Sequence, residues 1–117
     1  DVLPDGENKE VMVIQYDYGI VNEVNQVYMS GTSGEIQSHP DQLIRAGRAS
    51  YISVYNTLVK TTSIVLAQVS NTGVGGIVAV HAVTMMTVDG GFTITVRNID
   101  PDHDMTTTYK VSYILFL

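Results

Sequence analysis

Residues 77–97, IVAVHAVTMMTVDGGFTITVR, decide the fold class of this chain. In the second half of the stretch, apolar residues at 92, 94 and 96 alternate with Thr or Arg at 93, 95 and 97. A period of two is that of a β-strand with one buried and one wet face. Asp89-Gly90-Gly91 separates this strand from the apolar run 77–88, and glycine adopts the positive φ of a tight turn without steric cost. The stretch therefore predicts a β-hairpin.

The sequence on either side of the hairpin is also rich in β-branched residues. Val, Ile and Thr together account for 39 of the 117 residues, and their stiff side chains favour a pleated strand over a helix. Clusters of Gly, Pro, Asn, Asp and Ser divide the chain into further strands and loops. Beyond the hairpin we expect strands over 10–16, 21–29 (an edge strand), 49–59, 63–69 and 109–117, loops over 30–41 and 71–76, and an acidic turn over 100–104.

This pattern of about seven to eight short strands predicts an all-β fold, an antiparallel β-sandwich that is jelly-roll-like. A chain of 117 residues has the length of one domain, because two separate cores would each be too small. We therefore expect a single domain over 1–117. Residues 1–48 hold eight carboxylates against three basic residues, and we expect them to form an acidic N-terminal arm or an added strand pair. Because the chain begins at Asp1, we expect a processed terminus or a piece of a longer protein.

Charge and composition disfavour several classes of function. Lys+Arg is 6 and Asp+Glu is 12, for a net charge of −6, whereas nucleic-acid binding and docking on anionic lipid need a basic footprint. No apolar run approaches the roughly 20 residues of a spanning helix, so we expect no membrane insertion. The absence of cysteine removes disulfides and thiol nucleophiles. The three histidines lie in no recognisable nucleophile motif, and we expect no enzymatic activity.

The sharpest polar cluster is the turn at residues 100–104, DPDHD. Carboxylates that alternate on a tight turn can converge on Ca²⁺, a hard cation that prefers oxygen ligands. The EF-hand pattern is not met, because its glycine position is Met105 and its bidentate acid position is Val111. The alternative is a solvated turn in which Asp and Pro serve local hydrogen bonding. The candidate Ca²⁺ ligands are the three carboxylates of this turn, Asp100, Asp102 and Asp104.

Aromatic and apolar residues on the expected strands are candidates for contact with partners. Seven tyrosines occur with no tryptophan, and tyrosine suits protein interfaces and sugar stacking as well as ordinary strand packing. The expected C-terminal strand ends in four apolar residues, which predicts burial on both faces or in a subunit interface. The candidate interface residues on this strand are Tyr109, Val111, Tyr113, Leu115 and Leu117.

Residues 44–117 also carry a distinctive order of short motifs. The order runs from Ala46-Gly47-Arg48-Ala49 through Thr62-Ser63-Ile64-Val65-Leu66 to Gly90-Gly91-Phe92-Thr93-Ile94-Thr95, and closes at 107–115, TTYKVSYIL. It resembles the C-terminal heads of viral fibre, spike and other virion surface proteins. The resemblance implies a small β-sandwich that assembles as a homotrimer and acts in virion architecture or host attachment. It supplies no catalytic motif, and it does not extend to the acidic N-terminal third.

Two functions are therefore predicted from the sequence. The first is a non-enzymatic structural protein of the virion surface or capsid, a fibre or spike head or a capsid-associated protein. Its partners would be further copies of itself, in a trimer, together with other virion proteins and a cell-surface glycan. The alternative is an extracellular carbohydrate-binding domain, a lectin assisted by Ca²⁺ at the acidic turn. The low charge and the Val/Thr-rich strands favour the first, because an apolar surface of this kind is covered by symmetric assembly.

Overall fold

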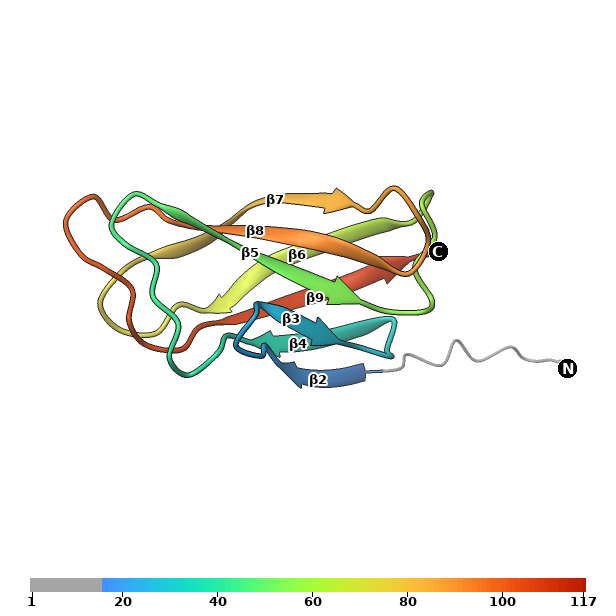
Figure 1. Cartoon of the computed structure of the whole chain (residues 1–117), viewed down its shortest axis with the longest axis horizontal. Coiled ribbons are helices and arrows are strands. Elements are labelled where there is room, and N and C mark those ends of the chain that lie inside the picture. The colour runs from blue at the N-terminus through green and yellow to red at the C-terminus, as the bar shows by residue number, and fades with distance from the viewer. Residues whose placement is uncertain (1–15) are drawn as a thin grey trace, which may run out of the picture.

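The computed structural model describes residues 16–117, and they form an all-β sandwich of two packed four-stranded sheets (Figure 1). The expected strand over 10–16 lies outside the described residues except for Tyr16. Residues 16–48 contribute three strands to the same sandwich. The strands are β2 (Tyr16–Ile20), β3 (Gln26–Tyr28), β4 (Ser33–Gln37), β5 (Ala49–Tyr55), β6 (Ile64–Asn71), β7 (Val78–Met85), β8 (Gly91–Asn98) and β9 (Lys110–Phe116).

The chain alternates between the two sheets for most of its length. One sheet has the order β2-β4-β9-β6 and is called the β9 sheet here; the other has the order β3-β5-β8-β7 and is called the β8 sheet. Among the described strands, only β7 and β8 are both consecutive in the chain and paired in one sheet. The expected hairpin is thus confirmed, with Gly90 at φ +113° in its connection. The pairing shifts between Val80 and Ala82, so His81 is the extra residue of a β-bulge.

The predicted all-β sandwich is confirmed, but two of its strand pairs are parallel, so its sheets are mixed and not antiparallel throughout. β2 pairs with β4 in parallel, and β3 pairs with β5 in parallel. In each case the intervening strand lies in the opposite sheet, so the chain reverses direction twice before it returns. Strands an odd number of steps apart, such as β5 and β8 or β6 and β9, are antiparallel. Local alternation cannot reveal this, because it gives a strand's faces and not its neighbour.

Two boundaries in the N-terminal half also differ from expectation. The segment 30–41, expected as a loop, contains β4, which pairs with β2 on one side and β9 on the other. The strand expected over 21–29 is reduced to β3 at the edge of its sheet. The Asn22 side chain accepts the backbone N–H groups of Val24 and Gln26, and Asn25 has φ 59°. This Asx-type turn competes with the strand.

Alternate residues of the strands fill the space between the sheets. Phe92, Ile94 and Val96 of β8 are fully buried, and the Phe92 ring lies 5.9 Å from that of Tyr113 on β9. Ile36 of β4 is equally buried. The wet positions predicted for β8 face outward, although only Arg97 among them is fully exposed.

Three long connections meet at one end of the sandwich, at the left in Figure 1, and are called the loop end. They are residues 38–48, 72–77 and 99–109. Ile44 and Met105 form an isolated antiparallel bridge between two of them. The Thr107 hydroxyl donates to the carbonyl of Val74 at 2.8 Å and so connects the third. Hydrogen bonds between the three connections therefore hold the loop end together.

Replacing Ile94 with Ala should lower the free energy of unfolding by about 2–5 kcal/mol, because the residue is fully buried and the cavity is only partly refilled. The matched control is Ile99→Ala, at a position 55% exposed, where we expect a loss below about 1 kcal/mol. Urea denaturation monitored by tyrosine fluorescence measures both. Equal losses for the two variants would contradict the described burial.

Candidate functional site

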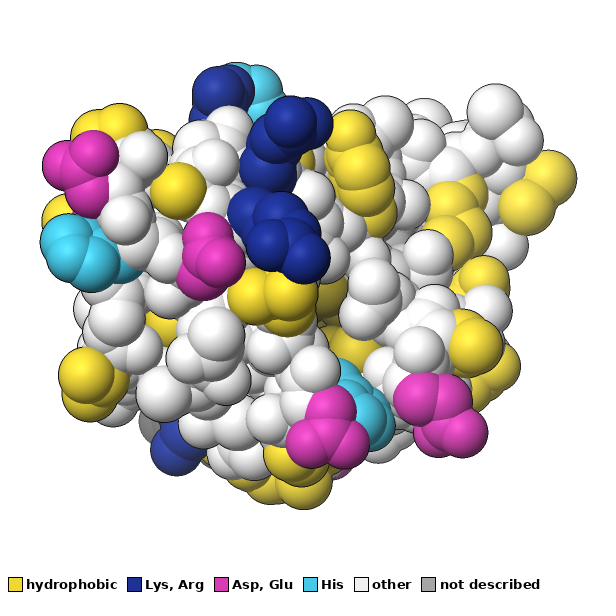
Figure 2. Space-filling view, turned by 60° about the vertical axis from the view of Figure 1, so that its left-hand side comes forward, with side chains coloured by type: hydrophobic (Ala, Val, Ile, Leu, Met, Phe, Trp, Pro, Cys, Tyr) yellow, Lys and Arg dark blue, Asp and Glu magenta, His cyan; other side chains and the backbone are white. Residues whose placement is uncertain are grey.

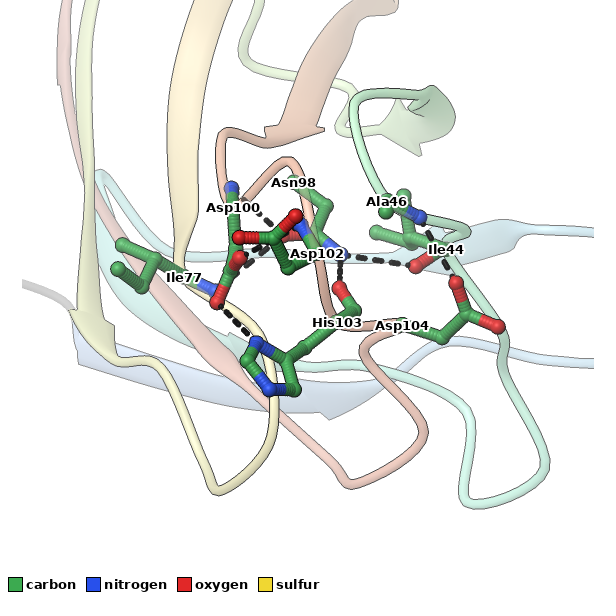
Figure 3. A network of polar contacts seen from close by, with 8 residues as sticks. All are labelled: Ile44, Ala46, Ile77, Asn98, Asp100, Asp102, His103 and Asp104. Carbon is green, nitrogen blue, oxygen red and sulfur yellow. Dashed lines mark hydrogen bonds and ion pairs between the residues drawn. The ribbon is translucent and has the colours of Figure 1, made fainter.

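The three carboxylates of the acidic turn point in different directions (Figure 3). Asp100 accepts the backbone N–H of Asp102 at 2.9 Å and lies 3.0 Å from Nδ1 of His103. Asp104 instead accepts the backbone N–H of Ala46 at 2.9 Å. Within residues 16–117 no group of three or more His, Cys, Asp or Glu side chains is arranged to hold a metal ion. The structure therefore does not bring Asp100, Asp102 and Asp104 together as one group of metal ligands. Each carboxylate makes a local contact or faces solvent.

The centre of this region is a residue that the sequence did not single out, the fully buried Asn98 at the end of β8. Its amide Nδ2 donates to the carbonyls of Ile44 and His103, at 3.1 and 2.7 Å. Its Oδ1 accepts the backbone N–H groups of Ile77 and Asp100, at 3.2 and 3.1 Å. One side chain thus joins all three connections of the loop end (Figure 3). A polar residue that ends an apolar strand is the only sequence signal for this role.

The candidate interface residues of the C-terminal strand are divided by the alternation of β9. Val111, Tyr113 and Leu115 face the core, as does Tyr109 just before the strand, and each is at most 5% exposed. They are therefore contacts within this chain and offer no surface to a partner. Leu117 is 70% exposed. The strand is not buried on both faces, as the apolar run had suggested, because its other residues point outward.

The two buried tyrosine hydroxyls are part of the scaffold. The Tyr113 hydroxyl donates to the carbonyl of Gly31 at 2.8 Å. Burial, opposed by a hydrogen bond from Asn56, raises the pKa of Tyr113 to about 12. Burial also raises the pKa of Tyr109 far above its ordinary value. Both phenols therefore stay protonated across the physiological range.

The outer face of the β9 sheet exposes a group of large apolar side chains. Leu66 is paired with Ile114 and Ile64 with Phe116, and all four are at least half exposed. β2 adds three more at the sheet edge, opposite the polar outward residues of β4. We call this surface the apolar sheet face; its members are Tyr16, Tyr18, Ile20, Ile64, Leu66, Ile114 and Phe116.

The outer face of the β8 sheet has a different character. Tyr28 and Tyr55 stack there, with ring centroids 5.2 Å apart and planes 22° apart. Tyr51 lies on the same face of β5, beside Thr95 of β8, and is 61% exposed. The tyrosines are therefore divided: Tyr109 and Tyr113 pack in the core, Tyr16 and Tyr18 lie on the apolar sheet face, and the other three lie on this face.

Comparisons with models of protein families, with curated proteins and with solved structures found no match to this chain. Residues 16–117 contain no helix with the length and apolar character that a membrane crossing needs.

Replacing Asn98 with Asp should destabilise the fold by at least about 2 kcal/mol, because a carboxylate would face two carbonyls that now receive N–H groups. The control is Asn71→Asp, at an exposed side chain whose contact, the N–H of Gly73, needs only an acceptor. That variant should lose less than about 0.5 kcal/mol. Thermal unfolding followed by circular dichroism measures both, and an unchanged midpoint for N98D would contradict the assigned network.

The pKa of Asp100 should lie below its ordinary value of 3.8, chiefly because its carboxylate accepts the N–H of Asp102 and in smaller part because of His103, with desolvation opposing both. The stability that Asp100 contributes is therefore present above pH 3.8 and is lost as the pH falls through the lowered folded-state pKa. NMR titration of its carboxyl carbon measures this. His103→Ala should return the pKa only part of the way to 3.8, and a complete return would refute the assigned order of causes.

Proposed function

We propose that this domain is a non-enzymatic structural unit of a virion surface, a fibre or spike head or a capsid-associated protein, which works as a homo-oligomer. The virion assignment rests on the resemblance of residues 44–117 to virion surface heads. The observation that supports assembly is the apolar sheet face. Scattered apolar residues are ordinary on a soluble protein, but a block of opposed apolar side chains, as on β6 and β9, is typical of an interaction site.

Register supports a continuous interaction surface. Leu66 and Ile114 are directly opposed across β6 and β9, and the next pair on the same face is Ile64 with Phe116. Opposed side chains on one face of a sheet lie roughly 5 Å apart, so these four form one block. A hollow of about 260 Å³ lies beside Leu66 and Ile114, lined by residues 66–68 and 112–114. Such a depression can seat an apolar side chain from a partner.

The charge of the face favours a second copy of this chain as the occupant. Each copy carries a net charge of −6, so most approaches between copies are repulsive. Among the described residues, the outward positions of the β9 sheet include one acid, Glu35 of β4, and one base, Lys110 of β9. Association through this face therefore adds no net like charge, and Glu35 of one copy can pair with Lys110 of another. Symmetric association of this kind is the commonest route to oligomers.

A carbohydrate-binding domain is the second candidate function. The observation that favours it is the exposed aromatic surface of the β8 sheet, where Tyr28 stacks on Tyr55 and Tyr51 stands free of both. Exposed tyrosine rings offer an apolar face with a polar edge, which suits the C–H face and hydroxyl rim of a sugar. The two functions use opposite sheets and are compatible in one molecule.

Light scattering after size exclusion should give the mass of a trimer or another closed oligomer for the native chain. Leu66→Lys should shift that mass to the monomer, because a charge then replaces the apolar side chain that is opposed to Ile114 across β6 and β9. Thr84→Lys is the matched control, since it adds the same charge at an exposed position on the β8 sheet. A native chain that stays monomeric at high concentration, or an L66K variant with the native mass, would refute the proposal.

A further inference from the structure

Positive charge is concentrated at one place on this acidic protein. Residues 16–117 contain five Lys or Arg side chains, and three of them, Arg45, Arg48 and Arg97, lie where β5 and β8 meet the loop end. Ala49 at the start of β5 is paired with Arg97, and the carbonyl of Arg48 accepts the N–H of Asn98 at 2.9 Å. Figure 2, which brings the loop end forward, shows dark-blue side chains gathered in one column on this face.

The three arginines differ in how far their charge is already compensated. Arg45 lies 3.9 Å from Asp104, which also accepts the N–H of Ala46. Neither Arg48 nor Arg97 forms an ion pair with another residue of the part of the chain that the structure describes. Both are exposed. Arg48, directly before β5, and Arg97, on the adjacent strand β8, are thus available to an anion from outside, in a chain of net charge −6.

A hollow is lined by Arg48, and Arg97 stands opposite Ala49, another of its lining residues. The hollow is a depression open to solvent, with a volume of about 500 Å³. Ala49 lies two residues before Tyr51 on the same face of β5, and it is paired with Arg97 of β8. Tyr51 contributes an exposed ring and Leu43 an exposed apolar side chain, at 61% and 48% exposure. The lining residues are Leu43, Ile44, Arg45, Arg48, Ala49 and Tyr51.

We propose that this hollow binds an anionic saccharide, a sugar ring that bears a carboxylate or a sulfate group. Arg48 and Arg97 bind the anionic group, because the planar guanidinium donates two parallel N–H bonds to such an oxyanion. The Tyr51 ring packs on the C–H face of the sugar, and Leu43 covers its apolar edge. Arg45, which lies beside Asp104, adds positive charge at the rim of the site.

The composition of the hollow favours a sugar over other anions. A bare inorganic anion would make no use of Tyr51 and Leu43, the two large apolar side chains that are exposed in the lining. A long polyanion such as nucleic acid would pass beyond this small patch onto a surface of net negative charge. A short saccharide with one or two anionic groups matches both the charge and the extent of the site.

This inference goes beyond assembly and rests on the second candidate function, for which it names the site and the class of ligand. The site is on the β8 sheet, whereas assembly is assigned to the β9 sheet. Binding should therefore survive in the Leu66→Lys variant. Measuring binding in that background separates a failure of the saccharide site from a failure of assembly.

Isothermal titration and ligand-observed NMR on the full chain test the proposal with five probes. They are glucuronate, N-acetylneuraminate, a sulfated glucose, neutral glucose and inorganic sulfate. We expect a carboxylated or sulfated sugar to bind, with glucose and inorganic sulfate at least about tenfold weaker, since charged hydrogen bonds and ring contact each contribute. Binding of the carboxylated sugars alone, or of the sulfated sugar alone, supports the site and identifies the anionic group. Equal binding of inorganic sulfate and sulfated glucose overturns it, as does binding of none of the probes.

Substitutions in and beside the hollow test which residues bind the ligand. The double change Arg48→Gln and Arg97→Gln should weaken binding by about tenfold or more, because it removes the charged hydrogen bonds. Lys60→Gln is the matched control, since it removes a positive charge beyond the opposite end of β5 and should change binding by less than about twofold. Tyr51→Ala should weaken the binding of the sugars by about fivefold and leave the binding of inorganic sulfate unchanged. Binding that is indifferent to the arginine changes, in variants with native circular dichroism, refutes the assignment.

Discussion

The contact between Phe92 of β8 and Tyr113 of β9 joins one inner strand of each sheet. β8 lies between β5 and β7, and β9 lies between β4 and β6, so these strands carry most of the pairing in each sheet. The two rings, 5.9 Å apart, bring the sheets together at a buried point. The hydroxyl of Tyr113 bonds the carbonyl of Gly31, and the buried Asn56 amide donates to that same carbonyl at 2.9 Å. Aromatic packing therefore also fixes the polar groups at this end of the core.

The same alternation that fills the core determines what the two outer faces display. On β9, the inward positions include Val111 and Tyr113, so Ile114 and Phe116 must point outward. The β9 sheet thus presents an apolar surface, which we propose packs against a second copy of the chain. The β8 sheet presents tyrosine, threonine and arginine, and these are chemically suited to a polar ligand. Two sheets with different outer chemistry allow one small domain to assemble through one side and bind through the other.

Asn98 connects the scaffold to the proposed ligand site. Its side chain joins the three connections of the loop end, and its backbone N–H holds the carbonyl of Arg48. The neighbouring residue Arg97 is thereby kept beside Ala49 on the adjacent strand. The acidic turn contributes Asp104, which holds Ala46 and compensates Arg45. Of the three carboxylates that the sequence suggested as metal ligands, Asp104 thus supports the segment that carries Arg45.

The sequence by itself determined the elements whose signal is local. The hairpin of β7 and β8, the strands β5 and β6 and the acidic turn were predicted because alternation and turn residues are read over a few neighbouring positions. The division of β9 into buried Tyr113 and exposed Ile114 was missed, since both residues are apolar and only the position of the opposite sheet distinguishes them. β4 was missed because its Gly-rich segment has no strand pattern of its own and is held by neighbours on both sides. The parallel pairs, the Asn98 network and the meeting of Arg48 with Arg97 were decided by tertiary structure alone, because each depends on residues far apart in the chain that are brought together when the strands cross between the two sheets.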